Sequence, residues 1–300
     1  MTHGISLPDL AAQVEHALQA AGVTFGHGTL SAHDEAAWLT LHALGLPLDT
    51  DLGAHDALIA PAAQARVQEL LRARIASRKP LAYLTHEAWL QGVPFYVDER
   101  AIVPRSLIAE LIADGGIDPW LSGQTQRVLD LCTGNGSLAC LAALAWPDVS
   151  VTGSDISSEA LAVARINVER HGLQARVQLV CGSGLTVCPG PWDLILCNPP
   201  YVNAASMAAL PPEYRAEPAL ALAGGTDGMD FIRALLHDLR TAQRQAPYLS
   251  PQGVLVLEIG HERAHFDAAF PDLPINELTT SAGHDQVLLI TAQALELWPG

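Results

Sequence analysis

The part of the chain that follows Arg127 alternates apolar runs with helical patterns, and this alternation restricts the possible folds more than any other feature. The apolar runs, which we expect to be strands, are Val128–Leu131, Val149–Ser154, Val177–Val180, Leu194–Cys197 and Val254–Glu258. The helical patterns between them are Leu138–Trp146, Ser158–Arg170 and Met229–Gln245. Continuous apolar strands joined through helices are typical of parallel sheets covered on both faces. The sequence therefore predicts an α/β fold with a doubly wound, mostly parallel sheet.

The end of the chain departs from this alternation. Two weaker strand patterns, Ile275–Leu278 and Gln286–Thr291, follow each other with no helical pattern between them. Strands joined by a short loop pair in the antiparallel sense. We therefore expect these two segments to close the sheet as an antiparallel hairpin.

Residues 1–80 predict a small helical domain. Ser6 and Ser31 stand where N-caps are expected, each followed three residues later by an aspartate, and Gly45 stands where the second helix ends. A third helix is expected over Pro61–Ser77. No cluster of titratable residues is evident in these helices, so we expect them to serve packing or partner binding.

Residues 81–105 predict a linking β-hairpin, and residues 106–300 the α/β domain. The strand-like runs of the linker are Tyr83–Leu84, Ala88–Leu90 and Val93–Val97. Gln91 and Gly92 form a turn signal between the last two runs. An apolar helix, Leu107–Ile112, is expected to open the α/β domain.

The charge of the chain limits its partners. Its 300 residues include 16 basic and 32 acidic ones, which gives a net charge of −16. A field of that sign repels nucleic-acid phosphates and attracts basic macromolecules, so direct nucleic-acid binding is not expected. The longest apolar run, Leu138–Trp146, has nine residues. A membrane span needs about 20, so none is expected.

The first residues and the cysteines favour a cytoplasmic location. The first sixteen residues lack the basic start and apolar core of a secretory signal. Five cysteines are present, with no C-x-x-C pair and no zinc-finger spacing to histidine: Cys132, Cys140, Cys181, Cys188 and Cys197. We therefore expect free thiols in a reducing compartment and no metal site.

The strand that ends at Leu131 runs into a glycine-rich turn and then a helix. The strand and turn contain Asp130, Cys132, Thr133, Gly134, Asn135 and Gly136. Glycines let the backbone approach a ligand closely, and a helix N-terminus offers free N–H groups to a carboxylate or phosphate. Many strand–helix turns carry glycine without binding anything, so this motif is weak by itself.

An acidic residue after the next strand strengthens the indication. Asp155 follows Gly134 by twenty-one residues. An acid at this place is suited to accept hydrogen bonds from the ribose hydroxyls of a nucleoside cofactor. A dinucleotide and S-adenosylmethionine both fit this pattern, and a helix-capping acid is the structural alternative.

The most specific motif is Asn198-Pro199-Pro200-Tyr201, which follows an apolar strand. The prolines remove two backbone donors, which leaves the Asn198 side-chain oxygen and the Pro199 carbonyl as free acceptors. Two acceptors that hold a planar NH₂ group can orient its nitrogen for attack on a methyl sulfonium. Tyr201 is expected to stack on the planar group. The motif therefore predicts methyl transfer to an amino group, and no dedicated base is evident.

Together these motifs resemble the protein glutamine methyltransferase family, which uses S-adenosylmethionine, over essentially the whole chain. The resemblance implies a Rossmann-like class I methyltransferase sheet behind a helical N-terminal substrate-recognition domain. It implies that the catalytic residues are Asn198, Pro199, Pro200 and Tyr201. It also implies that the cofactor is bound by Asp130, Cys132, Thr133, Gly134, Asn135, Gly136, Asp155, Ser183 and Asn198.

Within that family the chain looks closest to the branch that modifies protein three of the large ribosomal subunit. The stretches that favour this branch are Phe25–Thr29, Val103–Ser106, Pro212–Pro218 and Leu222–Gly228. The release-factor branch usually carries proline and acidic residues after the arginine that matches Arg105, where this chain has Ser106-Leu107-Ile108. The resemblance implies that the substrate is that basic ribosomal protein, methylated on a glutamine amide.

One position departs from the family pattern. Such enzymes commonly carry an acidic residue after the third strand, near the adenine, where this chain has Gly182 followed by Ser183. A backbone carbonyl or the Ser183 hydroxyl is expected to hold the adenine amino group instead.

Several polar residues outside these motifs have open roles. Arg105 is suited either to reach the mouth of the site or to a surface ion pair. Glu258 ends a strand and is expected to fix the neighbouring loop rather than to touch substrate. His27, His261 and His284 are expected to be surface residues of loops.

Three other functions are compatible with the sequence. A nucleic-acid amino-methyltransferase would use the same tetrapeptide on a flipped adenine or guanine, although the acidic charge disfavours it. The release-factor branch shares the chemistry but not the substrate. A catalytically silent binding module is the third alternative, and the intact Asn198–Tyr201 motif argues against it.

Overall fold

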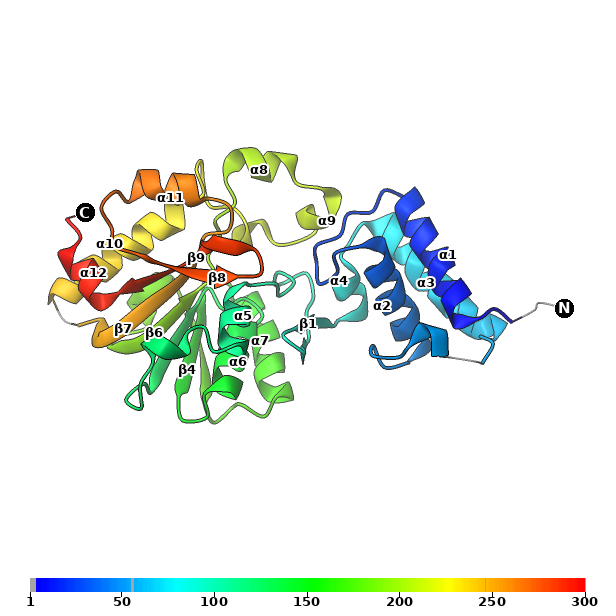
Figure 1. The fold of residues 1–300 in the computed structure, drawn as a ribbon, viewed down its shortest axis with the longest axis horizontal. Helices are drawn as coiled ribbons and strands as arrows, with labels where there is room; N and C mark the ends of the chain where they lie inside the picture. The colour runs from blue at the N-terminus through cyan, green and yellow to red at the C-terminus, as the bar shows by residue number, and fades with distance from the viewer. Residues whose placement is uncertain (1–3, 55–56, 246, 300) are drawn as a thin grey trace.

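The computed structural model describes residues 4–54, 57–245 and 247–299. A helical N-terminal domain lies beside a larger α/β domain, and the hairpin region lies between them (Figure 1). Within the described residues, no helix combines the length and the apolar character needed to cross a bilayer.

Three helices form the N-terminal domain, as predicted. They are α1 (Leu7–Ala20), α2 (Ala32–Leu44) and α3 (Pro61–Ser77), with a 3₁₀ turn at Leu52–Ala54. The side chains of Ser6 and Ser31 cap the first two helices by accepting the backbone N–H of Asp9 and Asp34. Gly45 ends α2 in the left-handed conformation. The apolar faces of the helices pack into a core of their own.

The linking hairpin is confirmed, but its first predicted strand is wrong. Tyr83 and Leu84 lie in a short helix, α4 (Leu81–Thr85), which follows Pro80. Proline favours the start of a helix, and the Tyr83 hydroxyl donates to the Ala101 carbonyl, so tertiary packing holds this turn. The hairpin itself consists of β1 (Ala88–Leu90) and β2 (Val93–Phe95), paired antiparallel.

All seven strands predicted after Arg127 are present and form one sheet within the described residues. They are β3 (Arg127–Leu131), β4 (Ser150–Asp155), β5 (Val177–Cys181), β6 (Trp192–Cys197), β7 (Leu249–Glu258), β8 (Asn276–Thr280) and β9 (Gly283–Thr291). Their order is β5-β4-β3-β6-β7-β9-β8. The first five strands are parallel, and β9 and β8 extend the sheet as the predicted antiparallel hairpin.

Helices cover both faces of this sheet (Figure 1). Alternate residues of a strand point to opposite faces. Leu194 and Leu196 of β6 therefore join the core under α5 (Ile108–Ala113), α6 (Ser137–Ala145) and α7 (Ser158–Arg170). Ile195 joins the opposite core, under α10 (Asp230–Gln245), α11 (Arg263–Ala269) and α12 (Ala292–Leu297). This two-sided burial explains why the strands read as continuous apolar runs.

Short helices in the long loops carry no periodic signal in the sequence. They are α8 (Ala204–Ala209), α9 (Pro212–Arg215) and the 3₁₀ turns Asp118–Trp120, Gly184–Val187 and Ala219–Ala221. Helix α9 reaches from the α/β domain toward the N-terminal helices (Figure 1). It carries the Glu213 side chain, which is completely buried.

The contact of α9 with the N-terminal domain overturns two expectations. The N-terminal helices do hold a titratable cluster: Arg74 Nε lies 2.7 Å from Glu35 Oε1, and both side chains are buried. Glu213 joins this cluster from α9, with its Oε1 2.7 Å from Arg78 Nε and 3.5 Å from Arg74 Nη1. His27 is only 3% exposed rather than a surface residue, and its ring lies 4.2 Å from that of Tyr214. The cluster went unpredicted because its members are far apart in sequence.

Candidate active site

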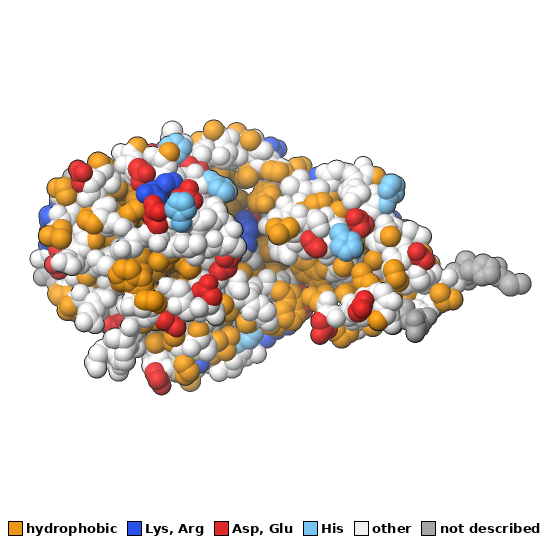
Figure 2. Space-filling view, viewed as in Figure 1, with side chains coloured by type: hydrophobic (Ala, Val, Ile, Leu, Met, Phe, Trp, Pro, Cys, Tyr) orange, Lys and Arg blue, Asp and Glu red, His pale blue; other side chains and the backbone are white. Residues whose placement is uncertain are grey.

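A cavity of about 900 Å³, including its open mouth, lies at the carboxyl ends of β3 to β6. This is the edge of an open α/β sheet where ligands bind. Six of the predicted site residues line it: Cys132, Gly134, Asp155, Ser183, Asn198 and Pro200. Figure 2 shows that the surface is hollowed between the two domains.

The glycine-rich turn has a backbone that only glycine adopts easily. Gly134 and Gly136 have φ values of +55° and +78°. A Cβ atom on Gly136 would lie 3.0 Å from that of Ala164 in α7, so this glycine lets α6 and α7 approach each other. Cys132 also has a positive φ, +62°, and lines the cavity. Gly136 is not part of the lining, and it supports the site by allowing α6 and α7 to pack closely behind the turn.

Asp130 lies behind the turn rather than in the cavity. Its side chain is completely buried, and its Oδ2 accepts the Thr133 hydroxyl and, at 2.9 Å, the backbone N–H of Ala139. Its Oδ1 has no hydrogen-bond partner among the described residues. Burial raises the pKa of this carboxyl to about 7. Thr133 and Asn135 are buried in the same turn and do not line the cavity.

Asp155 stands at the end of β4 and faces the cavity. Its Oδ2 accepts the backbone N–H of Gly134 at 2.9 Å, and its Oδ1 accepts that of Ser157 at 2.8 Å. Burial raises the pKa of this carboxyl. The carboxylate therefore joins the glycine turn to the start of α7, and it is the single acid among the described residues that line the cavity.

The Asn198–Tyr201 segment leaves β6 at the floor of the cavity. Asn198 and Pro200 line it, while Pro199 is buried. Among the described residues, neither the Asn198 side chain nor the Pro199 carbonyl has a hydrogen-bond partner within the protein. Tyr201 is not in the lining: its hydroxyl donates to Glu258 Oε1 at 3.1 Å, and a Cβ on Gly260 would meet its ring at 2.5 Å.

Glu258 holds two segments together, as the sequence indicated. Besides the Tyr201 hydroxyl, it accepts the Ser106 hydroxyl at 2.5 Å and the Leu107 backbone N–H at 2.9 Å. Its side chain is buried, and this burial raises the pKa of the carboxyl. The tetrapeptide loop is thereby anchored to the segment that enters α5.

Arg105 forms an ion pair with the α9 segment instead of reaching into the cavity. Its guanidinium donates to both carboxylate oxygens of Glu217, whose side chain is fully buried. Glu217 also lies 3.4 Å from His27 Nε2. His261 and His284 are exposed, as expected, but His284 lies in β9 rather than in a loop.

The structure gives a physical reason for Gly182. It lines the cavity, and a Cβ at this position would lie 2.3 Å from Val187 Cγ1 in the following 3₁₀ turn. An acidic side chain therefore does not fit here unless that turn moves. The neighbouring Ser183 is exposed at the cavity and has no side-chain hydrogen bond to cap the turn.

Sequence reasoning missed a second group of lining residues. They are Arg100, Ala101, Ile102, Leu131, Ser154, Ile156, Ser157, Ala160, Gly184, Pro218, Leu220, Ala221 and Phe231. Ile156 and Ser157 adjoin Asp155 and were within reach of the sequence argument. Arg100 and Phe231 had no such signal, because the hairpin region and α10 bring them in from distant segments.

These residues fit S-adenosylmethionine, the cofactor implied by the sequence resemblance. The cavity offers an acid at the end of β4, a glycine turn and one cation, and a buried carboxylate oxygen without a partner lies beneath the turn. Among the described residues, no group of three or more His, Cys, Asp or Glu side chains could hold a metal ion.

Comparisons with known proteins show the family of the chain. Residues 117–210 match the methyltransferase small domain. The chain is 53% identical to the ribosomal protein uL3 glutamine methyltransferase of Bordetella pertussis, over 97% of this chain and 96% of the relative. It is 48% identical to the protein of the same name from Burkholderia pseudomallei, over 96% and 94%.

A solved structure shows the same fold at low identity. The catalytic domain of hMettl16 in complex with MAT2A 3'UTR hairpin 6 is 14% identical, with a TM-score of 0.53, over 81% of this chain and 87% of that one. This likeness concerns the fold alone. With relatives this similar over nearly the whole length, the chain belongs to the ribosomal protein uL3 glutamine methyltransferases, a family of S-adenosylmethionine-dependent protein-glutamine methyltransferases.

Proposed function

We propose that this chain transfers a methyl group from S-adenosylmethionine to the side-chain amide nitrogen of a glutamine in uL3, protein three of the large ribosomal subunit. The two relatives named above carry that activity in their names. The observation that carries the proposal is Asn198, which lines the cavity and whose side chain has no hydrogen-bond partner among the described residues. The Pro199 carbonyl, which follows it in the chain, also has no donor among the described residues.

The two acceptors receive the hydrogens of the glutamine NH₂ group. An amide nitrogen is a weak nucleophile because its lone pair is delocalised into the carbonyl. Acceptors on both hydrogens orient the nitrogen and increase its electron density. The bound cofactor supplies an activated methyl group on its sulfonium. The nitrogen becomes strongly acidic once methylated, so its proton passes to water without a dedicated base.

The rest of the tetrapeptide supports this grip. Pro200 stiffens the loop, and the Tyr201 ring is expected to pack on the amide plane. The hydrogen bond from the Tyr201 hydroxyl to Glu258 fixes the position of that ring in the protein without substrate. Packing on the amide therefore requires the substrate to reach over the loop, or the ring to rotate.

The cofactor-binding set divides into contact residues and supporting residues. Cys132, Gly134, Asp155, Ser183 and Asn198 line the cavity, so we propose that they contact the cofactor. The remaining predicted residues, Asp130, Thr133, Asn135 and Gly136, shape the turn from beneath. Asp155 would receive the ribose hydroxyls at the acceptor positions that the Gly134 and Ser157 N–H groups leave free.

We assign substrate recognition to the N-terminal domain and the hairpin, residues 1–105. Two of the stretches typical of the ribosomal-protein branch, Phe25–Thr29 and Pro212–Pro218, meet where α9 contacts the N-terminal domain. There Tyr214 lies against Gly26 and His27. The net charge of −16 favours encounter with a basic ribosomal protein and disfavours direct nucleic-acid binding. We place the reaction in the cytoplasm, consistent with the absence of disulfides among the described cysteines.

A transfer assay with cofactor labelled in the methyl group tests this proposal. Purified protein is offered free uL3, a peptide release factor and mixed nucleic acid in parallel reactions. We expect label on uL3, lost when its target glutamine is replaced. Label only on the release factor would overturn the substrate, and label only on nucleic acid would overturn the reaction class.

A further inference from the structure

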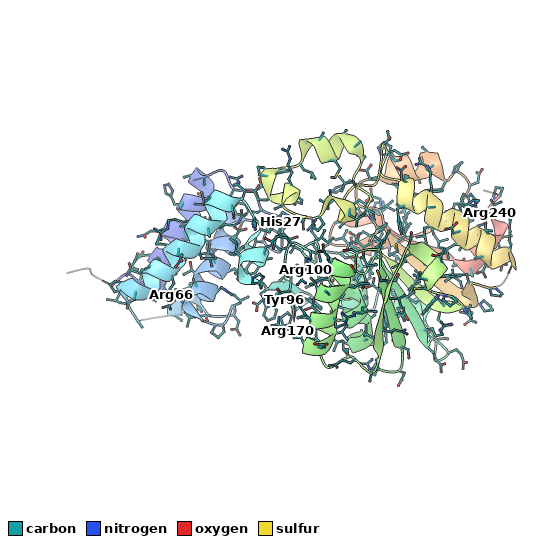
Figure 3. All side chains as sticks on the ribbon, turned by 180° about the vertical axis from the view of Figure 1, so that it is seen from behind. His27, Arg66, Tyr96, Arg100, Arg170 and Arg240 are labelled. Atoms are coloured by element: carbon teal, nitrogen blue, oxygen red, sulfur yellow. The ribbon has the colours of Figure 1, made fainter. Side chains whose placement is uncertain are left out.

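Arg100 is the one cation among the described residues that line the cavity. It lies in the segment between the hairpin and α5, far in sequence from the glycine turn. The adjacent residue, Ala101, is buried against Ala160 and Val163 of α7, which fixes this segment over the cavity. Figure 3 shows Arg100 and Tyr96 near each other between the N-terminal domain and the sheet.

A buried carboxylate orients the Arg100 side chain. Arg100 Nε lies 2.8 Å from Asp98 Oδ1, and Arg100 Nη2 lies 2.6 Å from Asp98 Oδ2. The Tyr96 hydroxyl donates to the same Asp98 oxygen at 2.9 Å. The hydrogen bonds from Arg100 lower the pKa of Asp98 to about 2, so this carboxylate stays charged at neutral pH.

One nitrogen of the guanidinium is left over. Nε and Nη2 donate to Asp98, and Nη1 has no acceptor among the described residues. The side chain is 38% exposed, so ligands can reach it. An arginine held on one edge by a carboxylate presents its other edge as a preorganised donor.

The chemistry of the cofactor indicates what this donor is for. S-adenosylmethionine carries a cationic sulfonium, an ammonium and a carboxylate, and the carboxylate is its only anion. The cavity also contains Asp155, Asp130 lies behind it, and the whole chain is acidic. A carboxylate that enters such a site needs a cation to offset the repulsion.

We propose that Arg100, oriented by Asp98, binds the carboxylate of the cofactor's methionine end. This makes Arg100 a cofactor-binding residue outside the glycine turn and the tetrapeptide. The proposal concerns the cofactor alone and is independent of which protein is methylated.

Calorimetric titration with two ligands tests the proposal without any methyl transfer. S-adenosylhomocysteine retains the amino-acid end, whereas methylthioadenosine lacks it. In Arg100→Met we expect the affinity for S-adenosylhomocysteine to fall about tenfold or more, the effect of losing a charge-assisted hydrogen bond. The affinity for methylthioadenosine should stay within about twofold, since this ligand has no carboxylate for Arg100 to bind.

Further variants separate this role from a structural one. Arg100→Lys should recover part of the affinity for S-adenosylhomocysteine. Asp98→Asn should lower the affinity for S-adenosylhomocysteine but not for methylthioadenosine, and by less than Arg100→Met does. Arg170→Met, at a half-exposed arginine 3.9 Å from Glu87, is the matched control and should change neither affinity. An equal loss for both ligands in Arg100→Met, or no loss for either, would overturn the proposal. A failed transfer to uL3 would leave this result untouched.

Discussion

Arg105 and Glu217 form a two-point ion pair, with Nη1–Oε1 and Nη2–Oε2 distances of 2.7 and 2.8 Å. Glu217 Oε1 also accepts the backbone N–H of Val103 at 2.9 Å. Through this carboxylate the segment after α9 is bound to the segment that enters α5. The pair therefore joins the segment that enters α5 to the long loop that follows Asn198–Tyr201.

Replacing Glu217 should reduce stability in a pH-dependent way. Burial opposes the charge, but His27 and Arg105 outweigh it and lower the pKa of Glu217 from 4.5 to about 2. A depressed native pKa stabilises the fold above pH 4.5, and this contribution is lost as the pH falls toward 2. At pH 7, Glu217→Gln should cost about 3 kcal/mol because it leaves Arg105 unpaired. Urea unfolding of the wild type and of Glu217→Gln at pH 7 and at lower pH checks this. If the difference between their free energies of unfolding does not shrink as the pH falls, the prediction is contradicted.

Asn198→Ala should stop methyl transfer while the cofactor still binds. The variant removes one of the two acceptors for the glutamine NH₂ group, and loss of one such positioned polar group typically costs about 100-fold or more in turnover. S-adenosylhomocysteine affinity should fall only slightly. The control is Asn276→Ala, at an exposed asparagine of β8, which should keep full activity. Wild-type turnover by Asn198→Ala would refute the role given to this motif.

Tyr201→Phe tests whether the anchor on Glu258 matters separately from the ring. The variant keeps the aromatic surface and removes the hydroxyl that donates to Glu258 at 3.1 Å. We expect a loss of stability of about 1–3 kcal/mol, because a buried acceptor loses its donor. Turnover should fall about tenfold with little change in S-adenosylhomocysteine affinity. Unchanged turnover and stability would show that the anchor is dispensable.

Gly136→Ala should be more harmful than the same change at a comparable glycine. Its φ of +78° costs an alanine about 1–2 kcal/mol, and the new Cβ would also lie 3.0 Å from Ala164. Gly172 has a φ of +66° and open space around it, so Gly172→Ala isolates the backbone cost. Thermal unfolding of both variants measures the difference between their losses of stability. No difference would show that α7 shifts without cost and would contradict the prediction.

Gly182→Asp should weaken cofactor binding, even though the family resemblance leads us to expect an acid at this position. The added Cβ would lie 2.3 Å from Val187 Cγ1, so the 3₁₀ turn beside the cavity would have to move. Adding Val187→Ala should recover part of the loss by removing the obstructing methyl groups. Calorimetric titration with S-adenosylhomocysteine checks both variants, and tighter binding by Gly182→Asp alone would contradict the steric argument.

The elements of the fold were predictable because their signals are local. Ser6, Ser31 and Gly45 mark helix ends by their own side chains or backbone freedom. The strands after Arg127 read as apolar runs because both faces of the sheet are covered. Tyr83 was misassigned because its aromatic character favours a strand, whereas its hydroxyl is held by Ala101 in a helical turn.

The sequence alone determined the class of the sheet, the succession of strands and helices along the chain, the glycine-rich turn and the Asn198–Tyr201 motif. Each of these depends on neighbours along the chain. Only the tertiary structure decided which residues line the cavity and which support it. It placed Asp130 behind the turn, bonded Tyr201 to Glu258 and brought Arg100 into the lining. These relations join residues that are distant in sequence, and burial and charge pairing across segments leave no periodic pattern in the chain.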